Sequence, residues 1–244
     1  MAEQRRDQLF ATPQKKTTRF VFDERVADVF ADMIARSVPG YATIVQQCGE
    51  LAARFVRSNS RCYDLGCSLG ATTLSMAQNM PTQGTRIIAV DNAPAMIDHC
   101  KRILDEYRPN VSVSLVQGDI CETAIENASM AALNFTLQFI APEKRSSLLA
   151  RIYHGLNSGG CLIVSEKIQV QPPELDVLMI ELHHQFKRTQ GYSDLEISQK
   201  RDAIENVLIP ETLTTHLQRL SDVGFKSASV WFQCYNFCSI IAIK

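Results

Sequence analysis

The sequence has almost no net charge and no long apolar run. Its 25 Lys and Arg nearly balance 26 Asp and Glu, so the formal net charge is −1. Such a chain has no long-range field that would hold nucleic acid or an anionic membrane. No apolar stretch approaches the ~20 residues that a membrane span needs. We therefore expect neither a nucleic acid nor a membrane as a direct partner.

The cysteines also lack a pattern, because none of the eight has a partner at C-x-x-C spacing. No set of Cys and His has the spacing of metal ligands, which argues against a zinc site. Cys62, Cys121 and Cys161 lie in or beside apolar runs, where a free thiol behaves as a small hydrophobe. We expect reduced, buried cysteines, a cytoplasmic protein and no metal.

The first 21 residues show no hydrophobic periodicity, and we expect residues 1–21 to form a solvated, disordered tail. The rest, 22–244, has the length of a single domain. Asp23 can cap a first helix, and a second helical pattern runs from about Tyr41 to Arg57. Strands then alternate with helices of 10–15 residues, a pattern typical of a parallel sheet covered on both faces.

Seven strands are predicted in all. They are "RCYDLG", "RIIAVD", "VSVSLVQGDI", "ASMAALNFTL", "CLIVSEK", "SASVWF" and "NFCSIIAIK". The last two have almost no room for a crossover, so they must pair antiparallel. Residues 171–209 interrupt the alternation with two helical patterns, the second opened by a Ser193/Glu196 capping box. We therefore predict an α/β, Rossmann-like fold: a mostly parallel sheet with one antiparallel strand, N-terminal helices and a helical insertion after strand five.

The stretch "YDLGCSLGATTLS" permits two interpretations. Gly66 to Gly70 matches the G-x-S-x-G elbow of hydrolases, with Ser68 as the nucleophile. That elbow needs an earlier strand for the oxyanion hole and a histidine beyond the last pair of strands, and both are lacking here. The alternative is a glycine-spaced cofactor loop between a strand and a helix. We prefer this second interpretation, in which Ser68 lines a cofactor.

Polar residues follow the predicted strands where ligands bind in doubly wound sheets. Asp91 ends strand two, where a carboxylate can bind both ribose hydroxyls. Asp119 and Ile120 follow strand three and suit an adenine amino group and an adenine face, and Asn134 ends strand four. Any one of these could simply cap a turn, but together they indicate one ligand crevice.

The acidic start of the loop favours a cationic cofactor. Asp64 would repel the pyrophosphate of NAD, the nearest rival, but would attract an amino or sulfonium group. S-adenosyl-L-methionine (SAM) has both, so the sequence predicts a SAM site. Ser68 stands where a glycine is usual, which makes the loop a variant.

A further charge is predicted inside the insertion. On a helix from Asp194 to about Leu208, Arg201 shares a stripe with Ile197 and Ile204. An inward guanidinium needs an anion, so Arg201 would either clamp a carboxylate in the crevice or form an internal salt bridge. Five other basic residues are candidates to line the same crevice, but we prefer to interpret them as the solvated face of a helix and leave them out of the predicted site: Arg36, His183, His184, Lys187 and Arg188.

Five long segments of the sequence narrow the prediction from a SAM-binding protein to one family. They are "FDERVADVFADMIARSVPGY", "YDLGCSLGATTLS", "ASMAALNFTLQF", "ELHHQFKRTQGYSDLEISQKRDAIENVL" and "WFQCYNFCSIIAIK". In them the chain closely resembles the bacterial carboxy-S-adenosyl-L-methionine synthases, within the class I SAM-dependent methyltransferase superfamily.

The resemblance implies an enzyme that converts SAM and prephenate into carboxy-SAM and phenylpyruvate. It also implies a homodimer, whose interface the apolar N-terminal helices could form, and a product that passes to a separate tRNA-modifying enzyme, which makes 5-oxyacetyl uridine at the wobble position. Arg201 would hold the transferred carboxylate. The nucleoside and amino-acid parts would lie against Tyr41, Gly66, Cys67, Ser68, Asp91, Asn92, Asp119, Ile120 and Asn134. A conventional methyltransferase and a non-catalytic SAM-binding module remain the alternatives.

Overall fold

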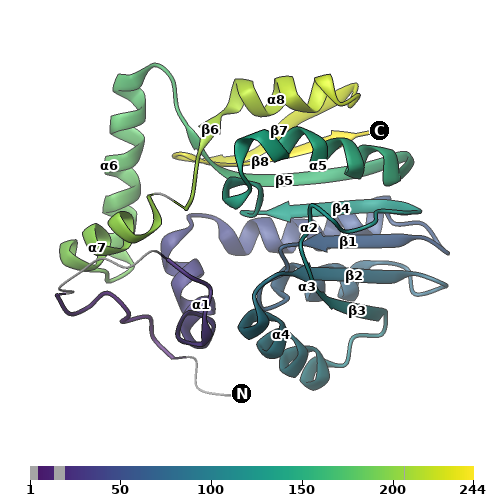
Figure 1. Cartoon of the computed structure of the whole chain (residues 1–244), viewed down its shortest axis with the longest axis horizontal. Coiled ribbons are helices and arrows are strands. Elements are labelled where there is room, and N and C mark those ends of the chain that lie inside the picture. The colour runs from purple at the N-terminus through teal and green to yellow at the C-terminus, as the bar shows by residue number, and fades with distance from the viewer. Residues whose placement is uncertain (1–4, 14–19, 206) are drawn as a thin grey trace.

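The computed structural model describes residues 5–13, 20–205 and 207–244 (Figure 1). Its helices are α1 (Glu24–Ser37), α2 (Tyr41–Phe55), α3 (Ala71–Asn79), α4 (Pro94–Tyr107), α5 (Pro142–Gly155), α6 (Pro173–Thr189), α7 (Asp194–Ile204) and α8 (Leu213–Asp222). Local signals set several of their starts. Asp23 caps α1, Pro94 and Pro142 open α4 and α5, and Ser193 with Glu196 forms the predicted capping box of α7.

The strands are β1 (Arg61–Leu65), β2 (Arg86–Asp91), β3 (Ser112–Gln117), β4 (Ala128–Asn134), β5 (Leu156–Gln169), β6 (Glu211–Thr212), β7 (Ser227–Cys234) and β8 (Phe237–Ile243). Their order across the sheet is β3-β2-β1-β4-β5-β8-β7. Only β8 runs against its neighbours β5 and β7 in this path. The predicted mostly parallel sheet with one antiparallel strand is confirmed.

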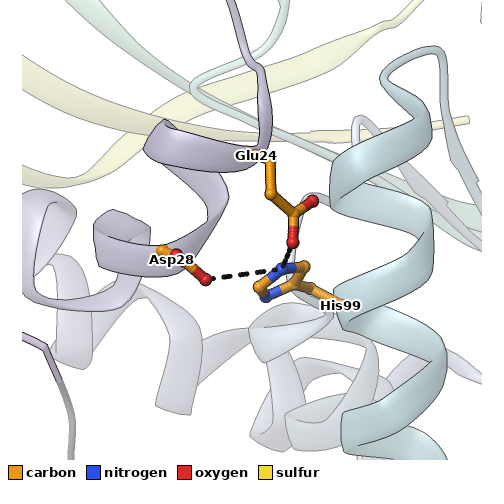
Figure 2. Close-up of side chains that lie close together, drawn as sticks. All are labelled: Glu24, Asp28 and His99. Carbon is orange, nitrogen blue, oxygen red and sulfur yellow. Dashed lines mark hydrogen bonds and ion pairs between the residues drawn. The ribbon is translucent and has the colours of Figure 1, made fainter.

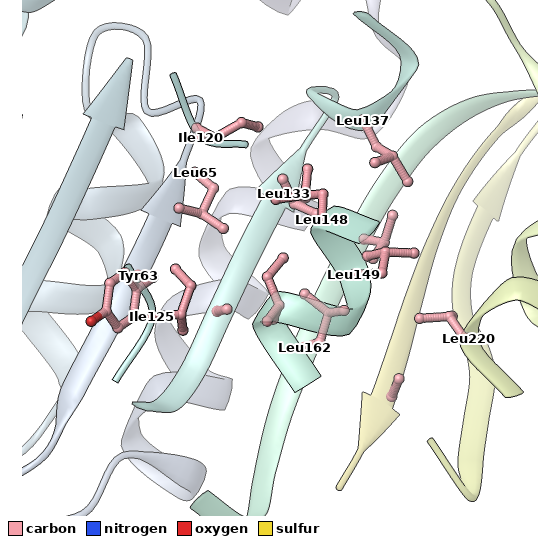
Figure 3. Packing of buried hydrophobic residues seen from close by; sticks show 14 of the residues in the cluster. Tyr63, Leu65, Ile120, Ile125, Leu133, Leu137, Leu148, Leu149, Leu162 and Leu220 are labelled. Carbon is pink, nitrogen blue, oxygen red and sulfur yellow. The ribbon is translucent and has the colours of Figure 1, made fainter. Parts of the chain in front are cut away.

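Alternation along the central strands builds a core on each face of the sheet. In β4, Ala131 and Leu133 point to the face covered by α5 and α8, whereas Met130 and Ala132 point to the face covered by α2, α3 and α4. Figure 3 shows the first of these cores, where Leu148 and Leu149 of α5 meet Leu162 of β5. With both faces buried, the parallel strands read as continuous apolar runs.

Two details of the prediction are wrong. The sheet has an eighth, two-residue strand, β6, which pairs with the end of β5 where a helix was expected to start. Part of the expected tail is also packed: Asp7 is buried and accepts a hydrogen bond from the Tyr192 hydroxyl (2.5 Å). Residues 1–4 and 14–19 of that tail lie outside the described residues.

A third cluster joins α1 to α4 and α7 above the strand ends, with Val29 and Met33 of α1 packed against Met96 and Ala203. Charged contacts reinforce it on the outside. His99 of α4 lies 2.8 Å from Glu24 and 3.8 Å from Asp28, both on α1 (Figure 2). Two guanidiniums complete this ion-pair network: Arg5 contacts Asp28, and Arg102 contacts Glu24. Since both carboxylates already have cationic partners, the network serves to fix α1.

The insertion forms a separate arm of the molecule. Helix α6 projects from the end of β5, and α7 returns toward α1 (Figure 1). Together they stand over the carboxyl ends of the parallel strands, on the side where α1 lies. No helix in the described ranges is long and apolar enough to cross a membrane.

Candidate active site

A cavity of about 400 Å³ opens at the carboxyl ends of the parallel strands, beneath α1 and the insertion. This volume lies within the range of pockets that bind drug-sized ligands. Of the eleven residues predicted from the sequence, ten line it: Tyr41, Gly66, Cys67, Ser68, Asp91, Asn92, Asp119, Ile120, Asn134 and Arg201. Residues from both halves of the chain therefore meet as expected.

The loop after β1 is shaped by its backbone. Gly66 and Gly70 have φ of 83° and 82°, and Ser68 has φ of 49°, so three of its residues adopt left-handed conformations. The N–H groups of Gly66 and Cys67 both donate to the carbonyl of Val90 (2.8 and 2.9 Å). The loop thus lies flat against the end of β2 and leaves its outer side open to the cavity.

Asp91 links this loop to the next strand. One carboxylate oxygen accepts the Ser68 N–H and the other accepts the Ala93 N–H, both at 2.9 Å. Burial raises the pKa of Asp91 above its usual value, although these bonds oppose the shift. An oxygen that accepts one N–H retains further lone pairs, so the carboxylate can still accept hydroxyl groups of a ligand. Asp119 is held similarly, through the Cys121 N–H at 2.8 Å.

Asn134 is fixed by hydrogen bonds on both sides of its amide. Its NH₂ group donates to the Thr72 hydroxyl (2.9 Å), and its oxygen accepts from Ser165 (2.7 Å). Tyr41 stands nearby with its ring 6.2 Å from that of Phe135. Burial raises the pKa of Tyr41, so its phenol stays protonated and can donate a hydrogen bond.

Asp64 is the predicted site residue that does not line the cavity. Its side chain is buried behind the loop and accepts the Thr73 hydroxyl (2.6 Å), and burial raises its pKa to about 6. The sequence prediction placed Asp64 in the loop's first turn, whereas it lies within β1 (Arg61–Leu65) and its side chain points toward Thr73 of α3. The direct role expected for Asp64 is wrong; it orients the start of α3.

Arg201 lines the cavity but does not have the burial that was predicted. The inward face of α7 carries Ile197, Lys200 and Ala203, and the helix ends at Ile204 rather than near Leu208. Arg201 lies one residue, about 100°, around from Lys200. Its side chain is 59% exposed and pairs with Asp202 at 3.0 Å. The buried charge of α7 is therefore Lys200.

A group of basic residues lines the opposite wall, and the sequence prediction left all of them out of the site. Lys167, His183, His184, Lys187 and Lys200 all line the cavity. The solvated-helix interpretation is wrong for His183 and Lys187, which are 4% and 9% exposed. It is also wrong for Arg36, which is buried outside the cavity lining and donates to the carbonyl of Gln190. Lys167 could have been found, because it stands at the end of a buried strand, as the predicted site residues do. The cations on α6 and α7 depend on how the insertion folds back, and no local pattern encodes that.

The cavity is consequently polarised. Asp91 and Asp119 lie on the β2–β3 side, and Lys167 lies on β5, with β1 and β4 between them. A cationic ligand part is favoured at the first end and an anionic one at the second. Aromatic rings also line the cavity: the ring of Phe22 packs edge-on against that of Phe139, with the centroids 5.4 Å apart.

Comparisons with known proteins agree with this architecture. A family model described as a methyltransferase domain matches residues 63–160. Human N-acetylserotonin methyltransferase, solved in complex with SAM, superposes with a TM-score of 0.61 at 21% identity, over 91% of this chain and 55% of that one. The chain thus spans little more than half of that protein, and the likeness concerns the fold. The fold is that of class I SAM-dependent methyltransferases.

Curated relatives define the family more narrowly. The carboxy-S-adenosyl-L-methionine synthase of Vibrio cholerae is 56% identical over 239 residues, which cover 98% of this chain and 97% of the relative. The enzyme of that name from Yersinia pestis is 53% identical over 243 residues, 100% of this chain and 91% of the relative. The chain belongs to the carboxy-S-adenosyl-L-methionine synthase family.

Proposed function

We propose that this chain uses SAM and prephenate to make carboxy-SAM and phenylpyruvate. The observation that carries the proposal is the family membership over the full chain, combined with a cavity that is acidic at one end and cationic at the other. Prephenate would lose carbon dioxide and its ring hydroxyl group, as hydroxide, while the ring becomes aromatic. The methyl group of SAM would give up one proton, which combines with that hydroxide to form water, and the methyl carbon would bond to the carbon dioxide.

The residues of the acidic end fit the cofactor. The carboxylate of Asp91 would accept the ribose hydroxyls, with Asn92 beside it, while Asp119 would accept the adenine amino group and Ile120 would pack on the adenine face. The flat loop of Gly66, Cys67 and Ser68 leaves room for the nucleoside, and the amide of Asn134 and the phenol of Tyr41 would bind the amino-acid part. When bound, SAM supplies a methyl group whose C–H bonds are acidified by the sulfonium.

Arg201 is the proposed ligand of the transferred carboxylate. It lines the cavity, and its contact with Asp202 is solvent-exposed. Exposed ion pairs contribute little, about 0–1 kcal/mol, so the guanidinium can exchange Asp202 for a ligand carboxylate at small cost. A guanidinium binds a carboxylate through two parallel N–H bonds, which also orients it.

The direct test is incubation of the protein with SAM and prephenate, followed by mass spectrometry. We expect carboxy-SAM and phenylpyruvate in equal amounts. Formation of S-adenosylhomocysteine with a methylated acceptor would instead identify a conventional methyltransferase. SAM that binds but is not consumed would indicate a non-catalytic module.

The product would pass to a separate enzyme that forms 5-oxyacetyl uridine at the tRNA wobble position. With a net charge of −1, this chain would not itself bind the tRNA. Eight free cysteines, seven of them buried, are consistent with a cytoplasmic location.

We also propose a homodimer, but not through the N-terminal helices. The apolar faces of α1 and α2 pack inside the chain. Exposed apolar side chains lie on the projecting α6 instead, at Leu175, Leu178 and Leu182 with Val177 beside them. Spacings of three and four residues place the leucines on one stripe, which would pack against a second copy.

A further inference from the structure

The cationic wall of the cavity holds two ammonium groups that form no direct ion pair with a described protein group, although the more distant carboxylate of Asp176 attracts Lys167. Lys167 is on β5 and Lys187 on α6, and neither side chain has a hydrogen bond or ion pair within residues 5–13, 20–205 and 207–244. Lys200, on α7, differs, because it donates to the Ser37 hydroxyl (2.9 Å) and lies 3.8 Å from Asp7. Burial lowers the pKa of Lys167, and burial with nearby lysines lowers that of Lys187 to about 7.

A buried cation elsewhere in this chain, Arg145, does have protein partners. Arg145 is fully buried on α5, and it contacts Glu211 and donates to the carbonyls of Ile140 and Ile209. An ammonium that is desolvated without such partners is costly, and Lys167 and Lys187 also repel each other. Two such lysines in a cavity wall are expected where a bound ligand supplies the anions that pair with them.

The surface between the cofactor loop and these lysines is aromatic. The ring centroids of Phe135 and Phe237 are 6.1 Å apart, Tyr41 stands 6.2 Å from Phe135, and His183 stands 4.8 Å from Phe237. His183 is uncharged, because burial lowers its pKa far below the usual value, and its Nε2 meets the carbonyl of Ser37 at 2.8 Å. The wall therefore combines a flat apolar face with two cations.

We propose that Lys167 and Lys187 bind the two carboxylates of a dianionic substrate whose six-membered ring packs against Phe135 and Phe237. This inference rests on the proposed function, in which prephenate is that dianion. The lysines then select a dicarboxylate over a monocarboxylate and place it beside the acidic cofactor end. Arg201, at the exposed side of the cavity, is left free for the carboxylate of the product.

Single substitutions Lys167→Met and Lys187→Met test the proposal, with Lys226→Met, an exposed lysine, as the matched control. Each cavity variant should raise the KM for prephenate by about 10- to 100-fold, the loss expected for one hydrogen-bonded charge. The dissociation constant for SAM should stay unchanged, as should both parameters in the control. Neither cavity variant should be less thermostable than the parent, because the charge that it removes is unpaired. An unchanged KM for prephenate in both variants would overturn the proposal.

A second readout does not depend on catalysis. Benzylsuccinate, a dianion with a six-membered ring, should raise the melting temperature of the parent protein more than hydrocinnamate, the monoanion. This difference should vanish in Lys187→Met and persist in Lys226→Met. If it does so but no carboxy-SAM forms, the proposed function fails while the dianion site stands. Equal shifts by the two probes in the parent would contradict the dianion site even if carboxy-SAM is made.

Discussion

Lys187 is only partly protonated near neutral pH, because burial and neighbouring cations lower its pKa to about 7. The charged or titratable groups of the elements around it are Lys167 on β5, His183 and His184 on α6, Lys200 and Arg201 on α7, and Asp7 in the N-terminal segment. Only the protonated ammonium attracts a carboxylate, so anion binding must weaken as pH rises through 7.

The first prediction follows for the pH profile. The KM for prephenate should rise by roughly 10- to 50-fold between about pH 7 and pH 9, since the protonated fraction of Lys187 falls from about one half to about one hundredth over these two pH units. Steady-state assays at fixed, saturating SAM measure this. Lys187→Met should have a higher KM that lacks this rise. A parent enzyme with a flat KM profile over that range would refute the role of Lys187.

Glu166 provides a second prediction at the residue scale. Its Oε1 accepts the Leu137 N–H (3.0 Å), its Oε2 is buried without a partner, and burial raises its pKa to about 8. The folded pKa is above the unfolded value, so the native state binds an extra proton between these values. The stabilising contribution is complete below the unfolded pKa and is lost as pH rises through about 8.

Glu166→Gln should remove this pH dependence. The amide oxygen can still accept the Leu137 N–H, and no charge then has to be buried at high pH. Relative to the parent, we expect the variant to gain about 2–4 kcal/mol of unfolding free energy between pH 5 and pH 9. Urea unfolding at the two pH values measures the change, with the exposed Glu106→Gln as control. A constant difference between variant and parent would show that Glu166 does not titrate in this range.

At the scale of elements, the cofactor loop gives a third prediction. Gly66 has φ of 83°, and a Cβ there would collide with the side chain of Thr136. Gly159 has φ of 76°, but nothing lies within 4 Å of a Cβ at that position. Gly159→Ala therefore measures the conformational cost alone, about 1 kcal/mol. Gly66→Ala should destabilise the protein more and weaken SAM binding about 10- to 100-fold, because the loop must move.

Isothermal titration and thermal unfolding of the two glycine variants separate these effects. Gly159→Ala should bind SAM as the parent does. Normal SAM affinity in Gly66→Ala would show that the loop backbone does not approach the cofactor.

The elements also show where sequence reasoning succeeds and where it ends. Asp91, Asp119 and Asn134 could be predicted, because strand ends are visible in the pattern and parallel strands bring their ends together. The inward face of α7 could not be predicted, because the face that carries Arg201 and the face that carries Lys200 lie only about 100° apart around the helix. Packing against Asp7 and Ser37, distant in the chain, decides between them.

At the scale of the whole molecule, the exposed apolar stripe of α6 leads to a fourth prediction. Apolar patches of this kind on soluble proteins mark contact sites. Leu178→Glu should convert a dimer into a monomer, measured by light scattering after gel filtration. Gln78→Glu adds the same charge at an exposed position of α3, away from this stripe, and should remain dimeric. A parent protein that is monomeric at micromolar concentration would contradict the proposed assembly.

The cavity is built by elements from both the sheet and the insertion. The sheet provides its acidic end, while β5, α6 and α7 provide the cations, so neither half of the site exists without the other. This division accounts for one ligand part that is cationic and another that is anionic. It is also why the sequence predicted the lining residues at the sheet end of the cavity but not those that the insertion provides.

The measurement that tests the account most directly is mass spectrometry of the nucleotide that copurifies with the freshly isolated protein. We expect a species heavier than SAM by one carbon dioxide, and we expect the Arg201→Ala variant to lose it while still binding SAM. Plain SAM in the parent, with no heavier species even after prephenate is added, would contradict carboxy-SAM synthesis and would leave Arg201 as a surface charge paired with Asp202.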